Sequence, residues 1–144
     1  MLSNRIDFES CDVLDLFAGT GAIGLEFVSR GARTATSVDN QGLTLKFIHE
    51  IIAKLGIENW NPVKSDAKLF CQKTNLKFDV IFADPPFDDP ATSALPALIF
   101  EHNLLKNNGI LIIEHDKNNS FENTTHFSQL RKYGGVHFSV FILP

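Results

Sequence analysis

The chain has 144 residues, of which 44% are hydrophobic and 21% charged, and its formal net charge is -4. This length and composition are typical of one globular domain and exclude a disordered or fibrous protein. No apolar run approaches the roughly 20 residues that span a bilayer, and residues 1–7 lack the apolar core of a secretory signal. We therefore expect one domain over residues 1–144, located in the cytoplasm and not in a membrane.

Short apolar runs alternate with helical patterns along the chain. The first half predicts a strand at residues 11–17, a glycine-rich turn at 18–21, a helix that Gly31 ends, and a strand at 33–39. A helix with Leu45, Ile48, Ile52 and Leu55 follows and ends at Gly56, and a strand at 60–65 and a short helix with Leu69 and Phe70 come next. The pattern then predicts a strand at 78–83, a helix with Leu95, Leu98, Ile99 and Leu105, and a strand at 109–113. Two extended stretches between residues 126 and 143 flank Gly134-Gly135, which is a hairpin signal.

Strands that alternate with helices predict a mostly parallel sheet covered on both faces, and the final hairpin predicts antiparallel strands at one edge. In such sheets, ligands bind beyond the carboxyl ends of the strands. The turns at Gly19 and at Asp84 each follow a predicted strand. We therefore expect both turns on one rim of the sheet.

The first turn, Gly19-Thr20-Gly21-Ala22-Ile23-Gly24, matches Gly-x-Gly-x-x-Gly between a strand and a helix, and Asp39 lies twenty residues beyond Gly19. This pattern is the dinucleotide-binding fingerprint, although a tight turn with a capping acid is the structural alternative. Glycines let the backbone approach a ligand, and an acid at the end of the second strand accepts hydrogen bonds from ribose hydroxyls. Any adenosine-containing cofactor, NAD included, is compatible with it.

Two further acids narrow the choice of cofactor. Asp15 lies four residues before Gly19, where a carboxylate sits poorly beside a pyrophosphate but suits the ammonium and sulfonium groups of S-adenosylmethionine. Asp66 ends the third strand, where it can accept a hydrogen bond from an adenine amine or simply cap the following helix. The pattern therefore favours S-adenosylmethionine over NAD.

The second turn, Asp84-Pro85-Pro86-Phe87, ends the fourth strand because proline cannot donate to a sheet ladder. Two prolines make it stiff, so that a carboxylate, a backbone carbonyl and an aromatic ring are fixed at one strand end. Asp84 and the Pro85 carbonyl can accept hydrogen bonds from the exocyclic amine of a planar base while Phe87 stacks on its ring. A purely structural turn would also explain the prolines. Glu114-His115-Asp116, at the end of the fifth strand, either line this site or mark the polar exit of the strand.

Other candidate sites are weak. Cys11 and Cys71 lie sixty positions apart, and neither they nor the five histidines show metal-ligand spacing. We expect no metal site. The 17 Asp+Glu against 13 Lys+Arg count against a large nucleic-acid surface but permit a local basic patch. Arg131-Lys132-Tyr133 could touch phosphate, although an exposed hairpin tip explains these residues as well.

These residues resemble the RsmD-type methyltransferases, which methylate the N2 amine of a guanine in bacterial small-subunit ribosomal RNA. The resemblance is carried by residues 13–26, Ser29-Arg30-Gly31-Ala32, Asp84-Pro85-Pro86-Phe87, Ile112-Ile113-Glu114-His115 and Lys132-Tyr133-Gly134. It implies an α/β, Rossmann-like class I S-adenosylmethionine-dependent methyltransferase fold, with a mostly parallel seven-stranded sheet and an antiparallel C-terminal hairpin.

The resemblance also implies a role for each motif. It assigns Asp15, Gly19 and Gly21 to the methionine end of the cofactor, Asp39 to its ribose, Asp66 to its adenine, and Asp84, Pro85, Pro86 and Phe87 to the target base. We expect the neighbours Phe17, Ala18, Thr20, Asn40 and Ala67 to complete the cofactor site. Two departures stand out. Family members usually carry Glu where this chain has Asp39, and because the chain begins almost at the first strand, we expect it to lack the N-terminal segment of the family.

The sequence thus predicts an RNA methyltransferase that converts S-adenosylmethionine to S-adenosylhomocysteine and acts on ribosomal RNA, either naked or within a small-subunit assembly, as a monomer. An adenine-N6 DNA methyltransferase and a protein glutamine methyltransferase use the same turn chemistry and remain alternatives. An NAD-dependent oxidoreductase would use the glycines and Asp39 but would leave Asp84-Pro85-Pro86-Phe87 without a task.

Overall fold

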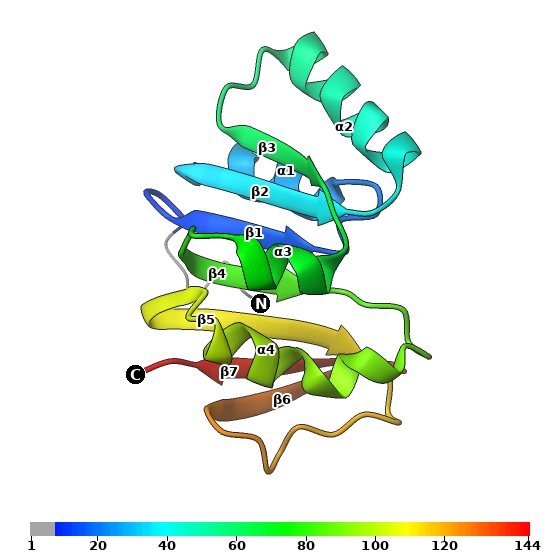
Figure 1. The fold of residues 1–144 in the computed structure, drawn as a ribbon, viewed down its shortest axis with the longest axis vertical. Helices are drawn as coiled ribbons and strands as arrows, with labels where there is room; N and C mark the ends of the chain where they lie inside the picture. The colour runs from blue at the N-terminus through cyan, green and yellow to red at the C-terminus, as the bar shows by residue number, and fades with distance from the viewer. Residues whose placement is uncertain (1–7) are drawn as a thin grey trace.

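Seven strands form one sheet, in the order β3-β2-β1-β4-β5-β7-β6, in the computed structural model, which describes residues 8–144 (Figure 1). The strands are β1 (Asp12–Leu16), β2 (Thr34–Asp39), β3 (Trp60–Lys64), β4 (Phe78–Ala83), β5 (Leu105–His115), β6 (Phe127–Tyr133) and β7 (Val136–Ile142). The helices are α1 (Ala22–Ser29), α2 (Gly42–Leu55), α3 (Ala67–Lys73), α4 (Leu95–Glu101) and the short 3-10 helix η2 (Pro90–Ala94). The prediction about a secretory signal in residues 1–7 lies outside the described residues.

The strand directions confirm the predicted architecture. β3, β2, β1, β4 and β5 are parallel neighbours, whereas β7 is antiparallel to both β5 and β6. The left-handed residue Gly134, with φ +63°, lies in the turn between β6 and β7. The chain order reverses between β1 and β4, which is where an open α/β sheet binds its ligand.

One predicted helix boundary is wrong, because Leu105 begins β5 instead of continuing α4. The helix ends at Glu101, and Asn103 adopts the left-handed conformation with φ 55°. The Leu104 amide then donates to the Ile99 carbonyl, which closes the helix end and redirects the chain. Leu95, Leu98, Ile99 and Leu105 have helical spacing, but the first three lie in α4 and Leu105 lies in β5.

Helices cover both faces of the sheet, with α3 and α4 in front and α1 behind in the view of Figure 1. On the α3 and α4 face, Leu14, Ile81 and Leu111 from three neighbouring strands join one buried cluster. On the other face, Phe27 of α1 packs against Val13 and Val80. Successive residues of β1 and β4 thus point to opposite faces of the sheet, as the period-2 side-chain pattern of a strand requires.

The third glycine of the first motif allows α1 to pack closely on the sheet. A Cβ atom at Gly24 would lie 2.6 Å from Ser37 Oγ and 2.7 Å from Trp60 Nε1. Those two atoms already form a buried hydrogen bond, in which Trp60 Nε1 donates to Ser37 Oγ at 2.9 Å. Gly24 thus lets α1 pack closely against Ser37 of β2 and Trp60 of β3.

The amino ends of the central strands carry a separate ion-pair network. Lys106 Nζ lies 2.9 Å from Asp12 Oδ2 and 3.0 Å from Asp79 Oδ2, and Arg33 also pairs with Asp12. The Arg33 hydrogen bond holds the pKa of Asp12 well below its usual range. These basic side chains therefore neutralise acids at the end of the sheet opposite the predicted site. None of the helices within residues 8–144 has the length and apolar character that a membrane span requires.

Candidate functional site

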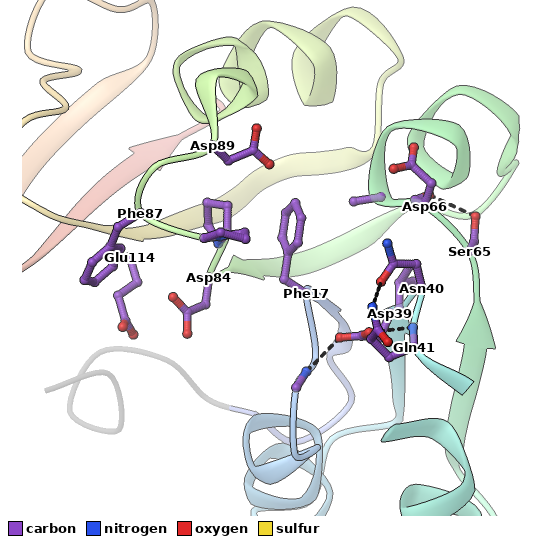
Figure 2. Close-up of a pocket in the computed structure, with 15 residues that line it drawn as sticks. Phe17, Asp39, Asn40, Gln41, Ser65, Asp66, Asp84, Phe87, Asp89 and Glu114 are labelled. Atoms are coloured by element: carbon purple, nitrogen blue, oxygen red, sulfur yellow. Dashed lines mark hydrogen bonds between the residues drawn. The ribbon is translucent and has the colours of Figure 1, made fainter. Parts of the chain in front are cut away.

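A cavity of about 670 Å³ opens at the carboxyl ends of the parallel strands (Figure 2). It is lined both by Gly19 of the glycine turn and by the whole of Asp84-Pro85-Pro86-Phe87. The two turns that the sequence places on one rim therefore line one cavity. Of the predicted cofactor residues, those that line it are Phe17, Gly19, Asp39, Asn40, Asp66 and Ala67.

The other predicted cofactor residues, Asp15, Ala18, Thr20 and Gly21, are not among the lining residues. Ala18 is buried, and its amide donates to the Val38 carbonyl at 3.0 Å. Gly21 has φ +83°, and a Cβ there would lie 2.7 Å from Ile48 Cγ1. Ala18 and Gly21 therefore shape the turn from beneath, while Thr20 is exposed on its outer side.

Asp39 both fixes the glycine turn and lines the cavity. Its Oδ2 accepts a hydrogen bond from the Gly19 amide at 3.0 Å, and its Oδ1 accepts one from the Gln41 amide at 2.9 Å. These bonds hold the carboxylate in one orientation between β2 and the turn. Because an ionised carboxylate has about four acceptor positions, each oxygen retains capacity for a ligand hydroxyl.

Asp66 is the N-cap of α3, which is one of the two roles that the sequence predicts for it. Its Oδ2 accepts a hydrogen bond from the Leu69 amide at 3.0 Å. The residue also lines the cavity, together with its neighbours Ser65 and Ala67. The cap restrains the carboxyl group, so that one oxygen serves the helix and the other is available at the cavity wall.

Phe17 holds a backbone conformation that non-glycine residues rarely adopt, with φ 64°. In the view of Figure 2 its ring stands between Asp84 on one side and Asp66 and Asn40 on the other. A left-handed conformation costs a residue with a Cβ roughly 1–2 kcal/mol, and such strain gathers at ligand sites. The conformation directs an aromatic face into the centre of the cavity.

Asp15 is an unpartnered buried acid beneath the turn. The residue is 2% exposed, and its Oδ2 has no hydrogen-bond partner among the described residues. Burial, reinforced by the nearby charges of Asp84 and Asp39, raises the pKa of Asp15 to about 8. A buried acceptor without a donor is costly unless a ligand completes it, and a cationic group is the natural complement. Asp15 does not line the cavity, so it would complement a cationic ligand from beneath the turn.

Asp84 and Glu114 form a second group of acids on the same rim. Both line the cavity. Burial raises the pKa of each, and the negative charge of Asp84 raises that of Glu114 further. Of the candidate residues Glu114-His115-Asp116, Glu114 thus lines the cavity, whereas His115 and Asp116 are not among its lining residues.

Four lining residues were not predicted, namely Val38, Gln41, Ser65 and Asp89. Val38, Gln41 and Ser65 are close neighbours in sequence of Asp39 and Asp66, so the ends of β2 and β3 signal them once the rim is known. Asp89 caps η2 through a hydrogen bond to the Ala91 amide. Its place in the cavity depends on the path of the chain after Phe87, which no sequence motif indicates.

The family model described as Conserved hypothetical protein 95 matches residues 1–142. The chain belongs to that family. Its resemblance to the RsmD-type enzymes is confirmed by a relative from Buchnera aphidicola named ribosomal RNA small subunit methyltransferase D, which is 37% identical over 103 residues. That alignment covers 72% of this chain and 53% of the relative, so the chain spans about half the length of this curated relative.

Solved structures confirm the class I methyltransferase fold. A candidate methylase of Haemophilus influenzae superposes with a TM-score of 0.90 at 24% identity, over 99% of this chain and 94% of its own. A Thermus thermophilus 16S rRNA N2 G1207 methyltransferase, solved with AdoMet and guanosine, superposes with a TM-score of 0.76 at 19% identity, over 94% of this chain and 38% of its own. At these identities the likeness establishes the fold.

Asp15 makes a testable contribution to the pH dependence of folding. Because its pKa is raised to about 8 in the folded state, the folded protein holds this proton more tightly than the unfolded chain does, and its contribution to stability is lost as pH rises from about 4 towards about 8. Asp15→Asn should therefore show a smaller fall in the free energy of unfolding across this range than the unmodified chain shows. Chemical denaturation at several pH values measures the difference.

Glu50→Gln, which changes an exposed acid on α2, serves as the control and should keep the original pH profile. An unchanged profile in Asp15→Asn would show that the Asp15 carboxyl titrates normally.

Proposed function

We propose that this chain binds S-adenosylmethionine and transfers its methyl group to the N2 amine of a guanine in small-subunit ribosomal RNA. One observation carries the proposal: a single cavity is lined by the glycine turn, which lies above an unpartnered buried acid, and by the rigid Asp84-Pro85-Pro86-Phe87 turn. The family, the Buchnera relative's name and the guanosine bound by the Thermus enzyme support it. A ribosomal RNA substrate would place the protein in the cytoplasm, where we expect it to act as a monomer.

The cofactor would lie along the carboxyl ends of β1, β2 and β3. Asp39 would accept hydrogen bonds from the ribose hydroxyls, Asp66 would accept one from the adenine amine, and Asp15 would face the methionine ammonium group. Gly19 would let the backbone approach, because the space at its Cβ position is open within 4 Å. When bound, the cofactor supplies a methyl group activated by a sulfonium centre.

The amine would be held at the end of β4. Asp84 and the Pro85 carbonyl would each accept one of its hydrogen bonds, while Phe87, 45% exposed at the mouth of the cavity, would stack on the base. Two accepted hydrogen bonds draw the nitrogen lone pair out of conjugation and direct it into the cavity. Catalysis would therefore rest on positioning and electrostatics, without a covalent enzyme intermediate. The base must be unpaired or flipped to enter.

A smaller hollow offers a contact for the RNA backbone. It has a volume of about 170 Å³, and one of its lining residues is His115, which follows Glu114 in the chain. Lys117 and Lys132 also line it, and Glu122 is the one acidic residue in its lining. We propose that this is the local basic patch that the net charge permits, where the lysines neutralise a phosphate beside the target nucleotide.

The direct test is methyl transfer from radiolabelled S-adenosylmethionine to small-subunit ribosomal RNA, presented both naked and in assembled subunits. Nucleoside analysis by mass spectrometry should identify N2-methylguanosine as the product. A product on adenine N6, or label in protein, would contradict the proposed substrate. Label in neither RNA nor protein, in both preparations, would contradict the activity of this chain.

Asp39→Ala should weaken binding of S-adenosylhomocysteine by about 1.5–3 kcal/mol, the range for hydrogen bonds that involve a charged group. Calorimetric titration measures the change. Asp88→Ala is a matched control, because Asp88 is exposed and is not among the cavity-lining residues. Unchanged affinity in Asp39→Ala would remove this residue from the cofactor site.

Asp84→Ala should leave affinity for S-adenosylhomocysteine within about twofold while kcat falls by roughly two orders of magnitude or more, because its carboxylate would contact the amine and not the cofactor. Single-turnover methylation of ribosomal RNA measures the loss, again with Asp88→Ala as control. Turnover near that of the unmodified chain would mean that another group orients the amine.

A further inference from the structure

Two carboxylates stand side by side where β4 and β5 end. The parallel register pairs Ala83 with Ile113, so Asp84 and Glu114 follow at the next position of neighbouring strands. Both side chains line the cavity, and Figure 2 shows their carboxyl groups directed to the same side of it. The pair is therefore a feature of the sheet itself and does not depend on a mobile loop.

Both members of the pair are held in place. The Asp84 amide donates to the Leu16 carbonyl at 3.3 Å, which ties the turn to the end of β1. Glu114 precedes His115, which is 1% exposed and has its two ring nitrogens 2.7 Å from the Asp116 carbonyl oxygen and from Ser139 Oγ. These contacts fix the end of β5, so that the Glu114 side chain starts from a rigid backbone.

Adjacent carboxylates repel each other when both are ionised, and burial adds to the cost. Here burial raises the pKa of Asp84, and burial together with the negative charge of Asp84 raises the pKa of Glu114. A ligand with two adjacent N–H donors would satisfy both oxygens at once and remove the repulsion. The paired acids would thus suit a ligand with two adjacent donors better than a ligand with one.

The edges of candidate substrates differ in this respect. Guanine presents N1–H beside the N2 amine, which makes two adjacent donors. Adenine presents its N6 amine beside N1, which is an acceptor, and a glutamine amide presents its amine beside a carbonyl oxygen. Of these three groups, only guanine offers a donor to each of the two carboxylates. Adenine and the glutamine amide would place an acceptor lone pair against the second carboxylate.

We infer that Glu114 accepts the N1–H of the target guanine while Asp84 accepts its N2 amine, which makes Glu114 the residue that selects guanine. The inference rests on the proposed function and deepens it by naming the residue that determines the substrate class. A carboxylate that must be satisfied by a donor rejects a base that lacks it, because the charge of the partly buried Glu114 would stay unpaired.

The test compares guanosine with 2-aminopurine riboside, which keeps the amine at C2 but has no hydrogen on N1. Binding of each to the full chain, loaded with S-adenosylhomocysteine, is measured by equilibrium titration. The unmodified chain should bind guanosine roughly ten- to a hundredfold more tightly. Glu114→Gln should lose most of this preference, because its amide can turn to accept from N1–H or to donate to an unprotonated N1.

Glu101→Gln, which changes an exposed acid at the end of α4, is the matched control and should keep the preference for guanosine. Thermal melting checks that each variant is folded. If Glu114→Gln does not fold, equal binding of the two ribosides by the unmodified chain still overturns the inference. Glu114→Asp, which keeps the charge, then tests the role of Glu114 and should retain part of the preference. The ratio of the two affinities isolates base recognition, since a purely structural role for Glu114 would weaken both ribosides alike.

Equal binding of the two ribosides by the unmodified chain, or an unchanged ratio in a folded Glu114→Gln variant, would overturn the inference. The proposed function would survive that result if N2-methylguanosine still formed in ribosomal RNA. Binding of neither riboside, together with no methyl transfer to RNA, would overturn both.

Discussion

The parallel pairing of β1, β4 and β5 is the constraint on which the site depends. Parallel strands place their carboxyl ends on one rim, so that residues separated by up to about a hundred positions in the chain become neighbours. In this protein the register aligns Leu16 with Ala83 and Ala83 with Ile113. The glycine turn, Asp84 and Glu114 follow directly from those positions. A slip of one residue would turn each of these side chains to the opposite face of the sheet.

The same rim concentrates negative charge, and that charge determines which ligands complete it. Asp15, Asp84 and Glu114 all have raised pKa values, chiefly because burial disfavours their charged forms. Arg33 and Lys106 pair with acids at the other end of the sheet. The cavity is therefore suited to ligands that bring cations or N–H donors, which are the chemical features of a sulfonium nucleoside and of a guanine edge.

Rigidity comes from tight packing beneath the rim. Gly21 and Gly24 leave no room for a Cβ, since Ile48 fills the space at one and Ser37 and Trp60 fill it at the other. Gly19, by contrast, has open space around its Cβ position. The three glycines of one motif thus have different roles. Gly21 lets α2 pack against the turn, Gly24 lets α1 pack against β2 and β3, and Gly19 leaves the backbone open at the cavity.

The sequence by itself determined most of the strands and helices and the two motif turns, because apolar periodicity, glycine and proline act over a few residues. Alternation of strands and helices was enough to place Gly19 and Asp84 on one rim. Local pattern did not distinguish Leu105 in a strand from Leu105 in a helix, and it left Glu114 open between a site residue and a strand exit. Only the tertiary structure decided these points, because they depend on the pairing of β4 with β5. The burial of Asp15 without a partner and the place of Asp89 in the cavity also arise from contacts between distant segments, which short-range pattern does not encode.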